Sequence, residues 1–443
     1  MTKPLRIGGG AGFLDDRVEP ALDLLENGGV DFLMLEHLAE RTLALLQEAK
    51  RSGRPGYVGN LRYRMETLLP PAAERGVRIV TNLGGADPAG AAGLVREVAK
   101  EKGLGHLKVA AVEGDDVTDL IRDLDPVLEE TGEKLSALGT PLLCANAYIG
   151  AFEMKDALDA GADVVLAGRV ADPALAIAPL AHHFGWGPDD LDALALGTMT
   201  GHMLECAGHT TGGNYVDGGR RVVPGLDRLG FPIAEVDGES LIVTKTATSG
   251  GLVDRHVVRQ QLLYELGDPS DYRTPDVTMD IGEVEAEELG RDRVRLSGAK
   301  GKARPEKLKV LCGVDNGWLG VAEISYGGWN AAGRAKLAAE TVEKRLRRDP
   351  KVSNLPMRFD IIGVSSVFVM GEPREDMYDA RFRMCIRAPD KDTAQHALSE
   401  AETLATNGPA GGGGKTQALR RTLRTYATFL PRDRVRPSWR MVD

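Results

Sequence analysis

Six near-continuous apolar segments alternate with amphipathic helical patterns along the first 200 residues. Each segment is rich in Val, Ile, Leu and Ala without polar alternation, which is typical of a strand covered on both faces. Strands that alternate with helices predict parallel βαβ units with right-handed crossovers. The segments begin at Leu5, Val30, Val77, Leu107, Pro141 and Ala162. We predict an α/β fold with an open parallel sheet flanked by helices. A partial α/β barrel is the alternative, because a complete one has eight strands.

The pattern changes near residue 220. Residues 190–215 predict one more helix. The apolar segments that follow, such as SLIVTK and RVRLSG, are shorter and alternate with polar residues, which favours an antiparallel or mixed sheet. Two helical patterns begin at Ala331 and Lys391. We predict two domains: residues 1–219 form the parallel α/β domain that carries the site, and residues 220–443 form an α+β domain with a mixed or antiparallel sheet and a glycine-rich loop.

Polar or glycine-rich residues follow every predicted parallel strand. The carboxyl ends of parallel strands share one edge of the sheet, where ligands of α/β proteins bind. The alternative is that these residues cap the next helices, for which Asp87 and either Asp115 or Asp116 are good candidates. The candidate catalytic residues are Glu36, Asp115, Asp116, Arg169 and Asp172. The candidate substrate-binding residues at the same edge are Gly9, Gly10, Asn82, Gly84, Gly85, Asn146 and Tyr148.

These residue types suit acid–base chemistry beside a carbonyl group. The carboxyl groups can move protons where burial raises a pKa. Asn82, Asn146 and backbone N–H groups at the glycine turns can stabilise an enolate oxygen. Arg169 can hold a carboxylate through two parallel hydrogen bonds, with Asp172 three residues later to orient it.

Two glycine-rich segments resemble nucleotide-binding loops without matching them. GGGAG at Gly8 has the place of a dinucleotide fingerprint, but Phe13 stands where the last glycine is needed. GPAGGGGKT carries Pro409 at the first glycine of a P-loop. Its glycines precede a predicted helix with Lys415, so their N–H groups could instead bind a phosphate or carboxylate; a flexible loop is the alternative. The candidate substrate-binding glycines here are Gly411, Gly412 and Gly413.

The remaining candidates are a helical His/Glu group and a lysine. His202, Glu205 and His209 are spaced to share one helix face, which makes His202 and Glu205 weak metal-ligand candidates. A buried pair without a metal is the alternative. Lys245 at a strand end could bind an anion or act as a base, or be a solvated surface lysine.

Composition limits the partners and the compartment. The chain has 443 residues and a net charge of −10, which disfavours nucleic acid as a partner. No apolar segment approaches the length of a membrane span or a signal peptide, and no polybasic segment suggests a membrane surface. The four cysteines are far apart, as expected for reduced thiols. We expect a cytoplasmic homo-oligomer that binds a small-molecule substrate.

Several segments, in order along essentially the whole chain, resemble the acyclic terpene utilisation (AtuA) family. They include HLAERT at His37, IVTNLGGADP at Ile79, VEGDDV at Val112, GHMLECAGHTTGG at Gly201 and NGPAGGGG at Asn407. The resemblance implies a role in the bacterial breakdown of citronellol- and geraniol-type terpenoids, which proceeds through acyl-CoA thioesters.

Together these features predict an enzyme that acts on an acyl-CoA or related carboxylic compound by hydration, dehydration or C–C cleavage. No cofactor is predicted, although NAD(P) and a divalent metal stay open as alternatives. A non-catalytic metabolite-binding or partner subunit is the second hypothesis. An NAD(P)-dependent oxidoreductase that uses the Gly8 segment is the third.

Overall fold

The computed structural model describes residues 3–367 and 377–443. It divides the chain into two compact units, and each is described by itself. The first contains residues up to 313 together with 425–443, and the second contains residues 314–424.

The first unit is built on a ten-stranded sheet in the order β11-β12-β8-β7-β1-β2-β3-β6-β4-β18. The five central strands, in the order β1-β2-β3-β6-β4, are parallel to their neighbours. They are β1 (Leu5–Gly12), β2 (Phe32–Glu36), β3 (Arg78–Thr81), β6 (Val164–Ala167) and β4 (Val109–Glu113). The predicted open parallel sheet is therefore confirmed. The alternative is not, since the described residues form no closed barrel.

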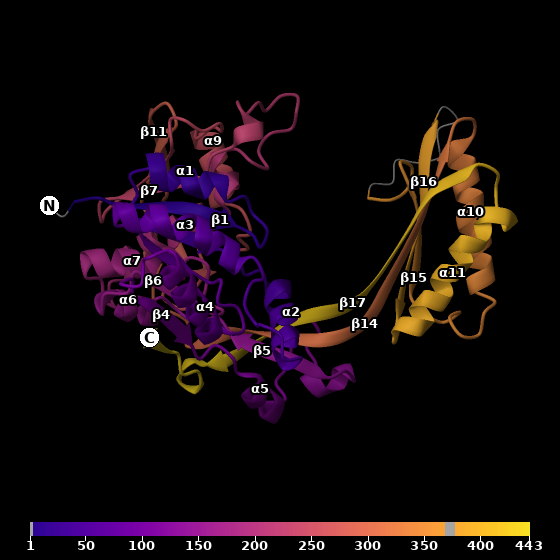
Figure 1. The fold of residues 1–443 in the computed structure, drawn as a ribbon, viewed down its shortest axis with the longest axis horizontal. Helices are drawn as coiled ribbons and strands as arrows, with labels where there is room; N and C mark the ends of the chain where they lie inside the picture. Colours follow the sequence, from indigo (N-terminus) through magenta and orange to yellow (C-terminus); the bar gives the residue numbers. More distant parts are fainter. Residues whose placement is uncertain (1–2, 368–376) are drawn as a thin grey trace. The chain divides into compact units, whose positions relative to one another are not determined.

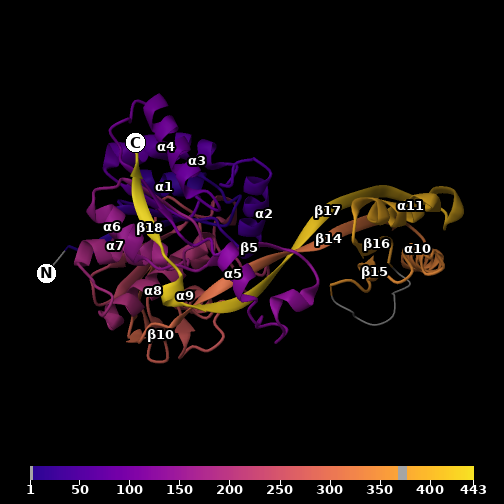
Figure 2. The same ribbon diagram turned by 90° about the horizontal axis from the view of Figure 1, so that it is seen from below.

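Antiparallel strands extend this sheet at both edges. On one side are β7 (Pro232–Val236), β8 (Leu241–Lys245), β12 (Arg293–Ser297) and β11 (Glu285–Gly290). On the other side β18 (Ser438–Val442) runs antiparallel to β4 and carries the C-terminus along the sheet edge (Figure 2). The structure thus differs from the predicted boundary between residues 219 and 220, because β7 pairs with β1 and continues the same sheet.

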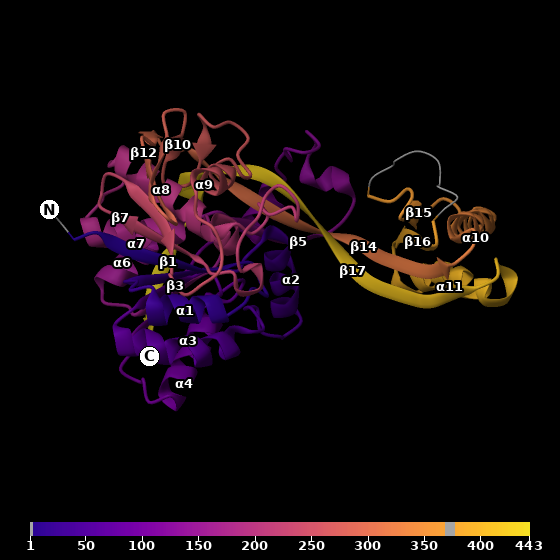
Figure 3. The ribbon, with the colours of Figure 1, turned by 90° about the horizontal axis from the view of Figure 1, so that it is seen from above.

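Two helical layers cover the sheet, which explains why its central strands are buried on both faces (Figure 3). One layer contains α1 (Glu19–Asn27), α3 (Leu61–Arg75) and α4 (Pro88–Glu101); the other contains α6 (Phe152–Asp159), α7 (Ala174–Phe184) and α8 (Leu191–Glu205). Further helices of this unit are α2 (Glu40–Arg51), α5 (Thr118–Leu124) and α9 (Arg255–Leu262). Short 3₁₀ helices are η1 (Leu135–Leu138), η2 (Ala207–Thr211), η3 (Leu226–Arg228) and η4 (Arg432–Arg434). A small antiparallel sheet has the order β13 (Lys300–Lys302), β10 (Thr278–Asp280), β9 (Tyr272–Arg273). In the part of the chain that the structure describes, no helix has the length and apolar character needed to cross a membrane.

The glycines of β1 allow α8 to lie directly on the strand. A Cβ atom on Gly9 would lie 2.7 Å from the carbonyl oxygen of Leu204, and one on Gly12 would lie 2.6 Å from the carbonyl carbon of Cys206. Both distances are shorter than any van der Waals contact permits. The segment that resembles a dinucleotide loop is therefore part of a strand, and its glycines make room for protein backbone.

One predicted strand lies outside the parallel sheet. The segment from Pro141 contains β5 (Leu142–Ala147), which pairs with β14 (Lys307–Gly327), whereas β4 pairs directly with β6. The end of β5 still reaches the sheet edge, because Asn146 bridges to Asp116 and Ile149 bridges to Val170.

The second unit has a β-α-β-β-α-β order and the strand sequence β15-β16-β14-β17, which is the ferredoxin-like arrangement. Helices α10 and α11 lie on one face of this sheet (Figure 1). Beyond β14, the elements are α10 (Ala331–Leu346), β15 (Met357–Ile362), β16 (Asp379–Ala388), α11 (Lys391–Asn407) and β17 (Gly412–Pro431). The predicted α+β character and both helices are confirmed for these residues.

The glycine-rich segment of the second unit does not precede a helix, contrary to the prediction. Helix α11 ends at Asn407, and Gly412, Gly413 and Lys415 belong to β17. The chain has to return as the edge strand of the sheet at this point. This segment therefore offers no helix N-terminus for the predicted anion contact.

Candidate active site

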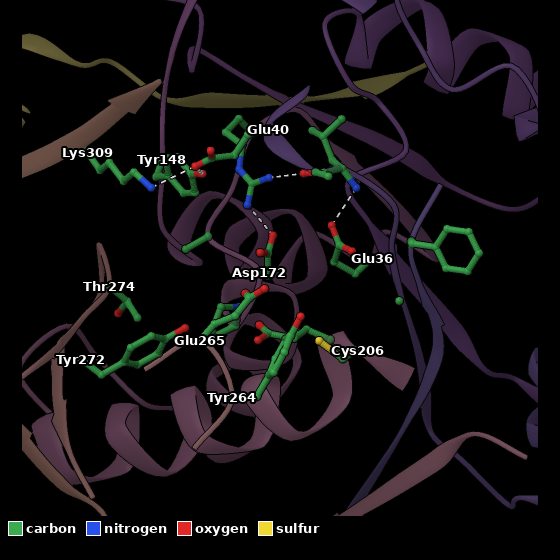
Figure 4. A pocket seen from close by; sticks show the side chains of 18 of the residues that line it. Glu36, Glu40, Tyr148, Asp172, Cys206, Tyr264, Glu265, Tyr272, Thr274 and Lys309 are labelled. Carbon is green, nitrogen blue, oxygen red and sulfur yellow. Dashed lines mark hydrogen bonds and ion pairs between the residues drawn. The ribbon is translucent and has the colours of Figure 1, made fainter. Parts of the chain in front are cut away.

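A cavity of about 1620 Å³ opens in the first unit at the carboxyl ends of β1, β2 and β6. The end of α8 and residues 264–265, 272–275, 278, 305–309, 425 and 429 also contribute to its wall. Figure 4 shows the carboxyl groups of Glu36, Asp172 and Glu265 facing a common space, with the rings of Tyr264 and Tyr272 beside it. The cavity therefore lies at the sheet edge where the sequence predicts a site.

Glu36 is the last residue of β2 and is buried. Its Oε1 accepts hydrogen bonds from the backbone N–H of Leu38 at 2.7 Å and from Nδ2 of Asn82 at 3.0 Å. Burial and the nearby charge of Asp172 raise the pKa of Glu36 to about 8, despite these hydrogen bonds. Glu36 therefore carries a proton at neutral pH.

Arg169 follows β6, and both terminal nitrogens of its buried guanidinium have protein acceptors. Its guanidinium donates to the carbonyl oxygen of Leu38 and to Oδ1 of Asp172. Its central carbon lies 4.3 Å from the ring centroid of Tyr148. These contacts use two of the five N–H groups of the guanidinium, and the two-point contact with a substrate carboxylate stays a prediction. Arg169 also holds Asp172.

Asp172 is the partner of this buried arginine and faces the cavity. One third of its side-chain area is accessible, compared with 2% for Arg169. Burial raises the pKa of Asp172, the positive charge of Arg169 opposes this, and the carboxyl groups of Glu265 and Glu40 add to the increase. The cavity floor therefore combines a fixed cation with several carboxyl groups.

Tyr148 forms one side of the cavity together with two charged residues. Its hydroxyl donates to Oε1 of Glu40 at 2.6 Å, and Nζ of Lys309 lies 2.9 Å from the same oxygen. Burial raises the pKa of Tyr148, so this hydroxyl remains protonated. The group fixes the wall of the cavity next to Arg169.

Helix α8 contributes a second buried acid. The predicted one-turn spacing is confirmed, because Nδ1 of His202 lies 2.8 Å from Oε1 of Glu205. His209 does not share their helix face, contrary to the prediction, because α8 ends at Glu205 and His209 lies in η2. Nowhere in residues 3–367 or 377–443 do three or more His, Cys, Asp or Glu side chains form a cluster able to hold a metal ion.

Three predicted residues lie behind the cavity and support its floor. Asp115 Oδ2 accepts from the backbone N–H of Arg169 at 3.0 Å and from Nδ2 of Asn146 at 2.8 Å. Burial raises the pKa of Asp115 to about 6. Asn82 contacts Glu36 and also accepts from the N–H of His37 at 2.8 Å. These residues fix the positions of Glu36 and Arg169 and do not line the cavity.

Other predicted residues form hydrogen bonds to neighbouring protein groups outside the cavity. Asp116 accepts from the N–H and hydroxyl of Thr118 at the start of α5, and the side chain of Asp87 caps α4. Lys245 donates to the carbonyl oxygen of Ser249 at 3.0 Å. The remaining predicted glycines are outside the cavity wall: Gly9 and Gly10 pack inside the first unit, Gly84 and Gly85 form a buried turn, and Gly411, Gly412 and Gly413 belong to the second unit.

Several cavity residues were missed in the sequence. Tyr264 and Glu265 lie in the loop between α9 and β9, and Tyr272 is the first residue of β9. No strand end marks them, and their only sequence signal is the polar and aromatic character of the segment YELGDPSDYR. Gly12 and Cys206, where β1 meets the end of α8, also line the cavity.

The fold and the cavity define an α/β protein with a pocket rich in protonatable carboxyl groups. The chain matches the family described as Acyclic terpene utilisation family protein AtuA over residues 5–441, and it belongs to this family. Comparison with curated proteins and with solved structures gave no match. The family links the protein to terpenoid catabolism.

Proposed function

We propose that the protein is an enzyme of acyclic terpenoid catabolism that performs acid–base chemistry beside the carbonyl group of an acyl-CoA or related carboxylic compound. Hydration, dehydration and C–C cleavage belong to this class. The observation that carries the proposal is Glu36, a carboxyl group with a pKa of about 8 in the cavity beside the Arg169–Asp172 pair. A proton carrier is most effective when its pKa lies near the working pH.

The lining of the cavity suits a substrate with an apolar chain and an anionic head. Its apolar wall is formed by Phe13, Leu38, Leu226, Leu229, Phe231 and Phe429. Exposed cations of the lining are Arg17, Arg41, Arg273 and Lys307. A branched hydrocarbon chain would bind the wall by burial of apolar area, and phosphate or carboxylate groups would bind the cations.

Product formation from thioesters tests the proposal. The purified protein is incubated with branched 3-hydroxyacyl-CoA and 2-enoyl-CoA compounds, and products are followed by mass spectrometry. We expect turnover, and a decrease of about 10²–10⁴-fold in Glu36→Gln, because loss of an acid–base group has effects of this size. Glu153→Gln is the matched control, since Glu153 is a partly buried glutamate outside the cavity.

The same incubation separates the other hypotheses. Saturable binding of thioesters without any product would favour a non-catalytic binding subunit. Thermal stabilisation by NAD or NADP would favour an oxidoreductase, although the β1 glycines contact α8 and offer no turn for a pyrophosphate.

A further inference from the structure

A second carboxyl group shares the cavity with Glu36. Glu205 ends α8 and lines the cavity, and His202 lies one turn earlier on the same helix. The His202 side chain is 1% exposed and that of Glu205 is 10% exposed. The position of α8 depends on Gly201, where a Cβ atom would lie 2.4 Å from Cα of Pro173, the residue after Asp172. Close packing thus places the last turns of α8 beside Asp172 and Pro173.

Both members of this pair keep an unused polar atom. Among the described residues, Oε2 of Glu205 and Nε2 of His202 are buried and have no hydrogen-bond partner. Buried polar atoms without a partner are rare, because each loses its hydrogen bonds to water. Since Glu205 lines the cavity, its carboxyl group with one unsatisfied oxygen lies next to any ligand bound there.

The pKa values of both members of the pair are raised. Burial raises the pKa of Glu205, and the charges of Asp172 and Glu265 contribute further. Burial lowers the pKa of His202, but the Glu205 carboxylate outweighs this and raises it above the usual value. Both shifts favour a proton between Nδ1 of His202 and Oε1 of Glu205, which lie 2.8 Å apart.

We propose that Glu205 is a second catalytic acid–base group, oriented by His202 as a positioning residue, and that the site eliminates water from, or adds water to, a thioester. This inference rests on the proposed function and assigns its two proton transfers. Glu36, which is neutral, gives a proton. Glu205, in its carboxylate form, takes one.

The elimination balances with these two groups alone. Glu205 accepts the proton from the carbon next to the carbonyl, and the electron pair of that C–H bond forms the C=C bond. The C–O bond of the 3-hydroxyl group breaks, and the oxygen leaves as water with the proton of Glu36. Solvent then returns a proton to Glu36 and removes one from Glu205. Addition of water is the reverse.

Hydrogen exchange separates the two roles. The probe is 3-methylbutanoyl-CoA in D₂O, which has exchangeable protons next to the carbonyl but no hydroxyl group to lose. We expect the wild type to incorporate deuterium, and Glu205→Gln to lose this by about 10²-fold or more. Glu36→Gln should retain exchange while losing product formation from 3-hydroxyacyl-CoA. Glu153→Gln should behave like the wild type in both assays.

The role of His202 is tested by a pH profile and by an NMR titration. Asn at position 202 can still donate a hydrogen bond to Glu205 but cannot carry the positive charge. His202→Asn should therefore move the pH profile of exchange to higher pH, because Glu205 loses its cationic neighbour. Nitrogen NMR of histidine-labelled protein should show a pKa of His202 above the usual value for histidine. The same measurement in Glu205→Gln should show a lower pKa of His202. If His202 had only a structural role, His202→Asn would leave the pH profile of exchange unchanged, and Glu205→Gln would leave the pKa of His202 unchanged.

The outcomes distinguish this inference from the proposed function. Exchange at the wild-type rate in folded Glu205→Gln, with product formation still dependent on Glu36, overturns the inference and leaves the proposed function intact. Normal titration of His202 in the wild type also overturns it. Absence of exchange and of product in the wild type removes both.

Discussion

Two arginines of the first unit are each surrounded by carboxylates but have opposite environments. Arg62 on α3 contacts Glu66 at 3.3 Å and Glu101 at 2.8 Å, and its side chain is 39% exposed. Arg169 contacts Asp172, and its side chain is 2% exposed. Both have an acidic partner three or four residues later, so the sequence spacing is similar. The difference between them is the amount of water around the charges.

Water determines what the carboxyl groups can do. At the surface, solvent stabilises each carboxylate, and an ion pair contributes little. In the cavity, burial raises the pKa of Glu36 and Asp172 even though Arg169 is adjacent. A cluster of charges thus becomes a set of proton carriers only where the fold removes the solvent.

Removal of the buried arginine should have the largest effect. Arg169→Ala leaves Asp172 and the Leu38 carbonyl without their donor, and breaking a buried pair costs about 3–5 kcal/mol. We expect a decrease of this size in the free energy of unfolding, measured by urea denaturation at pH 7, together with loss of activity. The double variant Arg169→Met/Asp172→Leu should recover most of the stability. A decrease below about 1 kcal/mol in the single variant would show that the pair is solvated like that of Arg62.

The sequence could predict this buried group only in part. Glu36, Arg169 and Asp172 were found because they follow apolar segments, and parallel strands bring their ends to one edge. The sequence does not reveal the role of the β1 glycines, because a glycine-rich strand and a glycine-rich turn have the same composition. Only α8, which follows much later in the chain, distinguishes them.

Other features depend on tertiary packing that no local pattern encodes. Lys245 ends a strand as expected, but that strand is antiparallel and its end lies outside the cavity. Glu265 lines the cavity from a loop whose position is fixed by neighbouring elements. Burial, which decides whether a carboxyl group keeps its proton, is also a property of the folded chain.

The pH dependence of stability should reveal the proton on Glu36. Its pKa is about 8 in the folded state and near 4.5 when unfolded, so between these values only the folded protein binds this proton. The free energy of unfolding should therefore fall as pH rises from 4.5 to 8, by at most about 1.4 kcal/mol per pH unit from this group. Glu36→Gln, which resembles the neutral acid, should remove that slope. Urea denaturation at several pH values measures it, and an unchanged slope would contradict the assignment.

Glu265 offers a smaller effect with opposite signs for stability and activity. Its φ of +59° is left-handed, which is unfavourable for a residue with a Cβ atom. Glu265→Gly should raise the free energy of unfolding by at most about 1 kcal/mol, because it relieves the backbone strain. The gain is limited because glycine also gives the unfolded chain more freedom, which lowers stability. It should lower turnover, since a charge felt by Asp172 and Glu205 is lost from the cavity. Higher stability with full activity would show that the strained acid is not needed.

The exposed arginine should give the smallest effect. Arg62→Ala removes contacts with Glu66, Glu97 and Glu101, more partners than Arg169 has, yet all of them are solvated. We expect no measurable change in the urea midpoint at physiological ionic strength, and at most a small decrease at low salt, where screening is weaker. Activity should be unchanged because α3 lies outside the cavity wall. A loss approaching that of Arg169→Ala would mean that the number of ion pairs, and not their burial, determines what an arginine contributes to this fold.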